Sequence, residues 1–328
     1  MKLNIKHTVC RHFFKLIYAL QTNTFLSTFL PKYIVSIIFI GVTIAVKGQE
    51  GSFIFSAGSS LDINKLQWSI AGNPQGQNPN ILSELIFKSV TSVGYYVDGT
   101  YKLLKPLDIN LFFKNSFTVS GSGTDTDYGK DNRTDPTYNL SFTSNKGNIK
   151  QFSAGADYHV YQKKDIDLAL GAGYEATTQL YYMTKADIPA LNSTYETKWK
   201  GLRIKAAARY NILPRLNIYA YMSYIFNKYE GRGNWNTIDA FQHPLSFLQH
   251  ANGNGLDATL GCQYKLNSLL SIDFSGNLGR FKTFKGTDNA YLSDGTTDLT
   301  QFNGAKNNYF NFRIGAVIFL GNTGRHFN

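Results

Sequence analysis

Strict alternation of apolar and polar residues is the feature that most constrains how this chain can fold. From Leu202 to Ile212, apolar side chains occupy every second position, and mostly charged or small ones lie between them. Because successive side chains of a strand point to opposite faces, this period of two predicts a strand with one apolar face. The alternation recurs after residue 49, with no helical period of comparable length. We predict about ten strands, near 52–66, 83–103, 107–120, 149–161, 166–175, 202–212, 216–226, 256–264, 272–279 and 310–318.

The segments between these strands favour a membrane barrel over a soluble sandwich. Counted from the first strand, long and short connections alternate, as the external loops and periplasmic turns of outer-membrane barrels do. Apart from the eight-residue stretch at 272–279, each strand is also long enough to cross a bilayer at a tilt, which takes about 9–11 residues. The short connections are expected near 105–106, 163–164, 214–215 and 267–268, and the long ones at 67–82, 121–148, 184–194, 228–253 and 284–307.

Composition supports the same class. Aromatic residues make up 15% of the chain, which suits the aromatic girdles of a barrel, and a mean hydropathy of −0.24 excludes a bundle of apolar helices. An array of secreted β-sandwiches is the soluble alternative. We therefore predict an all-β, transmembrane antiparallel up-and-down β-barrel over residues 49–319, followed by a tail at 320–328. Its expected location is the outer membrane of a Gram-negative bacterium.

The first 48 residues differ from the rest of the chain. Basic residues precede an apolar run at 33–46, and no acidic residue occurs before Glu50, which predicts a signal segment over 1–48 with cleavage near Gly48. Its removal would take away six basic and no acidic residues, lowering the net charge from +11 to +5. No nucleic-acid partner is therefore expected. Only Cys262 would remain, and no metal-type Cys/His spacing exists, so neither a disulfide nor a metal is expected.

Charged residues also fall on the inward face of the predicted strands. In a narrow barrel the lumen is filled by side chains, so these charges are expected to pair with one another. A small-solute channel is the alternative. If function is specific, we expect it on the external rim, because loops carry it. The inward charges are Asp167, Glu175, Arg203, Lys205, Arg209, Asp257, Asp273 and Arg313.

Two rim features contain residues that could perform chemistry. Asp125 and Asp127 lie two positions apart, so on an extended chain their carboxylates point the same way and can share a proton or hold a water. Asp-x-Asp is also common in solvated loops. The fourth long loop carries Asp239, His243 and His250, and a rim histidine that acts as a base is expected to be His243 or His250.

Three segments resemble the omptins, a family of ten-stranded outer-membrane barrels most of whose studied members are endopeptidases. Residues 83–88, Ser-Glu-Leu-Ile-Phe-Lys, are similar to the family's Ser-Gln-Leu-Asp-Trp-Lys. Residues 125–128, Asp-Thr-Asp-Tyr, resemble its Asp-Gln-Asp-Trp, and residues 172–175, Ala-Gly-Tyr-Glu, resemble its Ala-Gly-Tyr-Gln. The resemblance is spread over most of the chain after residue 49.

The resemblance implies a mechanism in which an Asp pair and an Asp-His dyad activate a water for attack on a peptide. Asp125 and Asp127 match the pair. The family's Asp-x-His is absent from residues 234–237, Asn-Trp-Asn-Thr, so the dyad would fall to Asp239 and His243 at a spacing of four. This assignment makes His243 the base and a peptide the substrate.

The resemblance also bears on partners. Of the family's lipopolysaccharide contact, Tyr-x-Glu-x-Arg, only Tyr174 is kept, which is a departure from the family. Outer-membrane lipid, with lipopolysaccharide as one candidate, is still an expected partner, and no cofactor is expected. The alternative to an endopeptidase is a non-catalytic surface barrel with an adhesive or structural role. In an adhesive role, loop aromatics such as Tyr229, Trp235 and Phe247 would meet a surface ligand.

Overall fold

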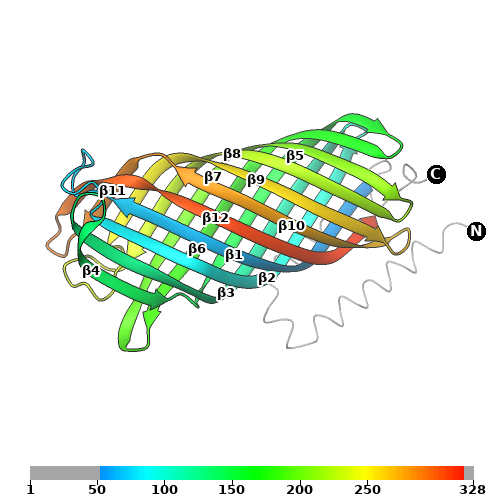
Figure 1. Cartoon of the computed structure of the whole chain (residues 1–328). Helices are drawn as coiled ribbons and strands as arrows, with labels where there is room; N and C mark the ends of the chain where they lie inside the picture. The colour runs from blue at the N-terminus through cyan, green and yellow to red at the C-terminus, as the bar shows by residue number, and fades with distance from the viewer. Residues whose placement is uncertain (1–51, 321–328) are drawn as a thin grey trace, which may run out of the picture. The chain divides into compact units, whose positions relative to one another are not determined.

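The computed structural model describes residues 52–320, which form one antiparallel sheet closed into a barrel (Figure 1). Closure comes from the pairing of the first strand with the last, in which Phe53 lies opposite Leu320. No helix in the described range is long and apolar enough to cross a membrane. The strands are β1 (Ser52–Ile70), β2 (Ser83–Leu104), β3 (Leu107–Lys130), β4 (Thr134–Thr143), β5 (Gly147–Lys163), β6 (Ile166–Lys185), β7 (Ile188–Leu213), β8 (Leu216–Asn234), β9 (Phe247–Lys265), β10 (Leu270–Thr283), β11 (Gly286–Tyr291) and β12 (Thr297–Leu320).

Twelve strands occupy ten positions around the ring. Strands β4 and β5 follow one another between β3 and β6, and both pair with each of these neighbours. Strands β10 and β11 do the same between β9 and β12. The barrel therefore has ten places around its circumference, two of which are each filled by two shorter strands in succession, and this confirms the prediction of about ten strands. The predicted signal segment 1–48 and the tail beyond Leu320 lie outside the described residues.

The strands reach farther toward the rim than we expected. Residues 121–148 were predicted as a long loop, but β3 and β4 pair through most of this segment and are joined by residues 131–133. Likewise, β6 and β7 are joined by residues 186–187, so the loop expected at 184–194 is wrong. Backbone pairing continues beyond the lipid, where an outward apolar face is no longer required. The short connections at the opposite end are confirmed near the expected positions, as in the β2–β3 turn at 105–106.

The wall has the two faces that the alternation predicted. Apolar side chains project outward, with Leu202 and Leu260 each 65% exposed and Leu278 62% exposed. In a membrane these residues contact acyl chains, so they mark the membrane-spanning part of the barrel.

Polar side chains of the membrane-spanning part face inward and pair with side chains of nearby strands. Lys205 Nζ lies 2.6 Å from an Asp157 carboxylate oxygen, and Arg203 Nη1 lies 3.3 Å from Glu175 Oε2. Near the periplasmic turns, Asp167 pairs with His159, at 2.6 Å between Nδ1 and Oδ1. The expected pairing of the predicted inward charges with one another is confirmed for Arg203 and Glu175. Lys205 and Asp167 also form ion pairs, but with Asp157 and His159, which the prediction did not include.

Candidate functional site at the extracellular rim

The rim end of the lumen holds a packed aromatic core. The ring centroid of Trp68 lies 5.4 Å from that of Tyr195 and 5.6 Å from that of Phe247, and Trp235 packs edge-on against Phe247 at 4.6 Å. These rings come from β1, β7, β9 and the residue directly after β8, so they span the barrel. The core also contains Leu66, Leu85, Phe87, Val90, Phe142, Tyr181, Met183, Trp199, Ile225, Tyr229, Phe281, Phe302 and Ala305.

A second set of rings lies in the same core. Phe87 and Tyr181 stack at 4.6 Å, and both are almost fully buried. Tyr229 contacts Trp199 at 4.5 Å and stacks on Phe302 at 5.5 Å with an interplanar angle of 3°. Side chains from strands on opposite sides of the ring thus meet and fill the cross-section.

The core also encloses a chain of hydrogen bonds. The Tyr195 and Tyr229 hydroxyls lie 2.5 Å apart, and Tyr195 donates to Gln249 Oε1 at 2.5 Å. Gln249 Nε2 donates in turn to Asp288 Oδ1 at 2.8 Å. Burial raises the pKa of the Asp288 carboxyl to about 6. This network ties β7, β8, β9 and β11 together within the rim.

Asp125 lies at the edge of this core, outside the membrane-spanning part. It projects inward from β3 and is only 5% exposed. The indole Nε1 of Trp235 donates to its Oδ2 at 3.2 Å, and its other oxygen is buried without a hydrogen-bond partner. Burial first, and then the nearby Asp127 charge, raise the pKa of Asp125 to about 7.

Asp127 follows at the next inward position of β3 and is half-buried. Burial also raises the pKa of its carboxyl, against the lowering effect of a hydrogen bond with Ser83. The structure therefore places Asp125 and Asp127 on the same side of the strand, as their spacing predicted. Each carboxyl is partly or largely removed from water, which favours its protonated form relative to an exposed aspartate.

The two remaining predicted site residues lie in the 235–246 connection between β8 and β9. Asp239 and His243 are both exposed. His243 Nδ1 lies 2.8 Å from Asn234 Oδ1. Asn234 directly precedes Trp235, whose indole donates to Asp125. Among the hydrogen bonds of the described residues, none joins His243 or Asp239 to Asp125 or Asp127. The structure thus brings the two acids together and gives Asp125 an indole as its neighbour.

The partner of Asp125 could not be found from the motif. Trp235 lies 110 residues away in sequence. The one sequence signal for its role is the alternation of β8, in which every second residue faces inward and Trp235 is the next inward position after Gly233. The suggestion that Tyr229, Trp235 and Phe247 present an adhesive surface is wrong. Their side chains are 2%, 8% and 6% exposed, because they pack into the core.

A family model supports the class, and the superposition with one solved barrel supports the fold. The family model described as "Pom: Protochlamydia outer membrane protein" matches residues 62–317. Outer membrane protease OmpT from Escherichia coli superposes with a TM-score of 0.61 at 13% identity, covering 82% of this chain and 96% of that one. Outer membrane protein OprG from Pseudomonas aeruginosa gives a TM-score of 0.33 at 13% identity, covering 83% and 97%. No curated protein matches the chain.

A closed barrel with an apolar exterior and a charged, packed interior defines an integral protein of the outer membrane. Within this class, the chain belongs to the family of Protochlamydia outer membrane proteins, whose model matches most of the barrel. The likeness to OmpT, at 13% identity, concerns the fold. The omptin resemblance is thus supported at the level of the barrel architecture.

Proposed function

We propose that this protein is a sealed, non-catalytic barrel with a structural role in the outer membrane. The observation that carries the proposal is the burial of Asp125 beneath Trp235 at the edge of an aromatic core that fills the rim. A water held by the Asp pair would need access to a substrate carbonyl. The Asp125 side chain offers almost no surface for such a contact.

The interior also argues against a solute channel. In the membrane-spanning part, inward polar side chains such as Asp62, Lys114 and Asp257 are at most 5% exposed, so this part of the lumen is packed. Above it, the stacked rings of the core leave the cross-section filled. A barrel packed at both levels is suited to a static role.

The test uses the full chain in its own bacterium. Deletion of the gene should increase uptake of an apolar dye such as N-phenylnaphthylamine, and both the unaltered protein and Asp125→Asn should restore the barrier. A proteolytic role instead requires Asp125 and Asp127, so restoration by the unaltered protein alone would contradict the proposal.

A direct assay accompanies this genetic one. The purified barrel in lipid vesicles should leave a fluorogenic peptide library uncleaved, with OmpT as the active control. Cleavage that is lost in Asp127→Ala, while the variant keeps the heat-dependent gel shift of a folded barrel, would favour the endopeptidase alternative. His243→Ala then asks whether that activity needs the exposed histidine as base.

A further inference from the structure

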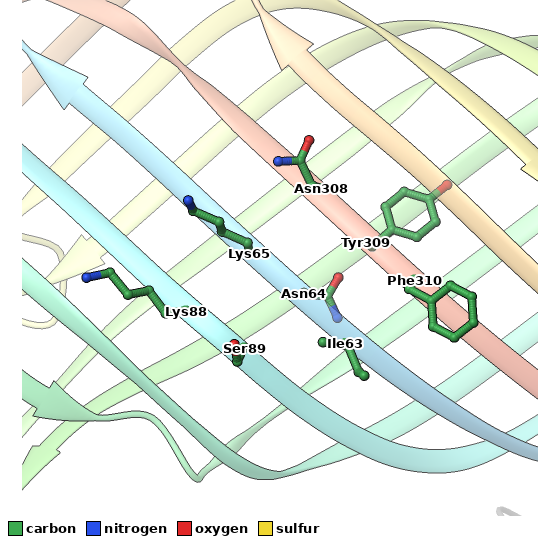
Figure 2. Close-up of a pocket in the computed structure, with 8 residues that line it drawn as sticks. All are labelled: Ile63, Asn64, Lys65, Lys88, Ser89, Asn308, Tyr309 and Phe310. Carbon is green, nitrogen blue, oxygen red and sulfur yellow. The ribbon is translucent and has the colours of Figure 1, made fainter.

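A groove opens on the outer wall where β1, β2 and β12 meet (Figure 2). It has a volume of about 470 Å³. The β1–β2 register shifts between Asn64 and Leu66, which leaves Lys65 without a partner on β2. Opposite this shift, Ser89 adopts a φ of 49°. The groove therefore lies over an irregularity in the pairing of β1 with β2. The groove is lined by Ile63, Asn64, Lys65, Lys88, Ser89, Asn308, Tyr309 and Phe310.

The groove has a cationic end and an apolar end. In Figure 2 the ammonium groups of Lys65 and Lys88 lie on the rim side, and Ile63 and Phe310 lie on the side away from the rim. Ile63 is 40% exposed and Phe310 is 43% exposed, and both belong to the outward apolar face. Lys65 and Lys88 are exposed directly above them. The change from apolar to cationic residues therefore falls where acyl chains give way to headgroups.

More positive charge surrounds the cationic end. The Lys306 ammonium lies within electrostatic range of Arg280, Lys65 and Lys282. Lys282 and Lys306 lie directly opposite one another on β10 and β12. Like charges in this arrangement repel and destabilise the sheet. Within residues 52–320, no ion pair with a carboxylate includes Lys65, Lys88, Arg280, Lys282 or Lys306.

We propose that this groove binds a phosphorylated lipid of the outer leaflet, with the phosphate on Lys65, Lys88 and Lys306 and an acyl chain along Ile63 and Phe310. An ammonium group forms strong, charge-assisted hydrogen bonds with phosphate oxygens. Basic residues next to a membrane attract anionic headgroups. A lipid is the occupant because the apolar end of the groove continues into the lipid-facing wall, where a free phosphate would gain no contact. The site is independent of whether the lumen is sealed.

The test measures lipid binding to the full chain, delipidated in detergent, by native mass spectrometry. The probes are dioleoyl phosphatidic acid, dioleoylglycerol, which has the same chains without phosphate, and inorganic phosphate. We expect phosphatidic acid to bind at least ten-fold tighter than dioleoylglycerol, and inorganic phosphate not to displace it. The triple variant Lys65→Gln, Lys88→Gln, Lys306→Gln should weaken phosphatidic acid binding by about ten-fold or more.

A matched control removes the same number of charges elsewhere on the outer face. Lys150, Lys200 and Lys228 are exposed on β5, β7 and β8, away from the groove in the ring order. Their triple change to Gln should leave binding within about two-fold. The corresponding Lys→Arg triple at the groove keeps the charge and should also retain binding.

Three outcomes overturn the proposal. They are equal losses in the groove and control triples, binding of dioleoylglycerol as tight as that of phosphatidic acid, and displacement of the lipid by inorganic phosphate. If the groove triple fails to give the heat-dependent gel shift of a folded barrel, the single changes Lys65→Gln and Lys88→Gln decide. Each should weaken binding by at least about three-fold, and unchanged binding in both contradicts the site.

Discussion

Replacement of Lys114 by Met should strongly destabilise the barrel. Lys114 projects from β3 into the lumen and forms an ion pair with Asp62 of β1, and both side chains are nearly inaccessible, at 6% and 4% exposed. Asp62 also accepts hydrogen bonds from Ser116 at 2.7 Å and from Asn311 at 3.0 Å. The pair therefore joins three strands of the wall through one carboxylate.

The magnitude follows from what Lys114→Met leaves behind. Asp62 would retain two neutral donors but lose the one ion-pair partner it has among residues 52–320, in a site that is nearly closed to water. Removal of one partner of a buried pair costs about 3–5 kcal/mol, whereas neutralising both often costs far less. The double variant Asp62→Asn, Lys114→Met should therefore recover at least about 2 kcal/mol of the loss.

Urea unfolding in lipid vesicles measures these free energies, with the fluorescence of Trp68, Trp199 and Trp235 reporting the rim core. Lys150→Met, which removes an exposed outward lysine, is the control and should change stability by less than about 0.5 kcal/mol. A Lys114→Met variant within 1 kcal/mol of the unaltered barrel, or a double variant no more stable than the single one, would refute the reasoning.

Three further predictions concern the rim. Since burial raises the pKa of Asp125 from 3.8 to about 7, the folded state binds a proton more tightly, and stability should fall as the pH rises from about 4 to about 7. Asp125→Asn should remove up to about 4 kcal/mol of that fall, and an unchanged pH dependence of the urea midpoint contradicts this. Trp235→Phe deletes a hydrogen-bond donor that lowers the Asp125 pKa, so the loss of stability with rising pH should extend to higher pH. A loss of stability that instead ends at lower pH would argue against the indole contact. Phe87→Ala, at a fully buried ring, should cost about 3–5 kcal/mol, whereas Phe284→Ala, at a ring 60% exposed, should cost under about 1; equal losses would argue against the packed core.

Much of the wall could be predicted from the sequence because a strand's two faces are a local property. The segment from Leu202 to Ile212 specifies both its extended backbone and its lipid-facing side without reference to any neighbour. The upper parts of the strands were missed for the same reason. The positions that alternate with Asp125 on the other face are Thr124 and Thr126, which are not apolar, so the alternation weakens although the backbone pairing of β3 with β4 continues.

The contacts that define the site depend on register and closure. The spacing of Asp125 and Asp127 predicts that both face one side, but the indole of Trp235 reaches Asp125 only through the arrangement of the ring. The same holds for the groove. Lys65 and Lys306 are 241 positions apart and become neighbours only because β1 pairs with β12. Local patterns do not determine such pairings.

Single-channel recording in a planar bilayer tests the sealed barrel most directly. The full chain, inserted into a phospholipid bilayer in 1 M KCl at about 100 mV, should give no stable conductance steps, because the stacked rings around Trp199, Tyr229 and Phe302 fill the lumen. Replacement of these three residues by Ala in a barrel that still folds should produce steps. Uniform, persistent steps from the unaltered protein would contradict the sealed lumen and restore the channel as its function.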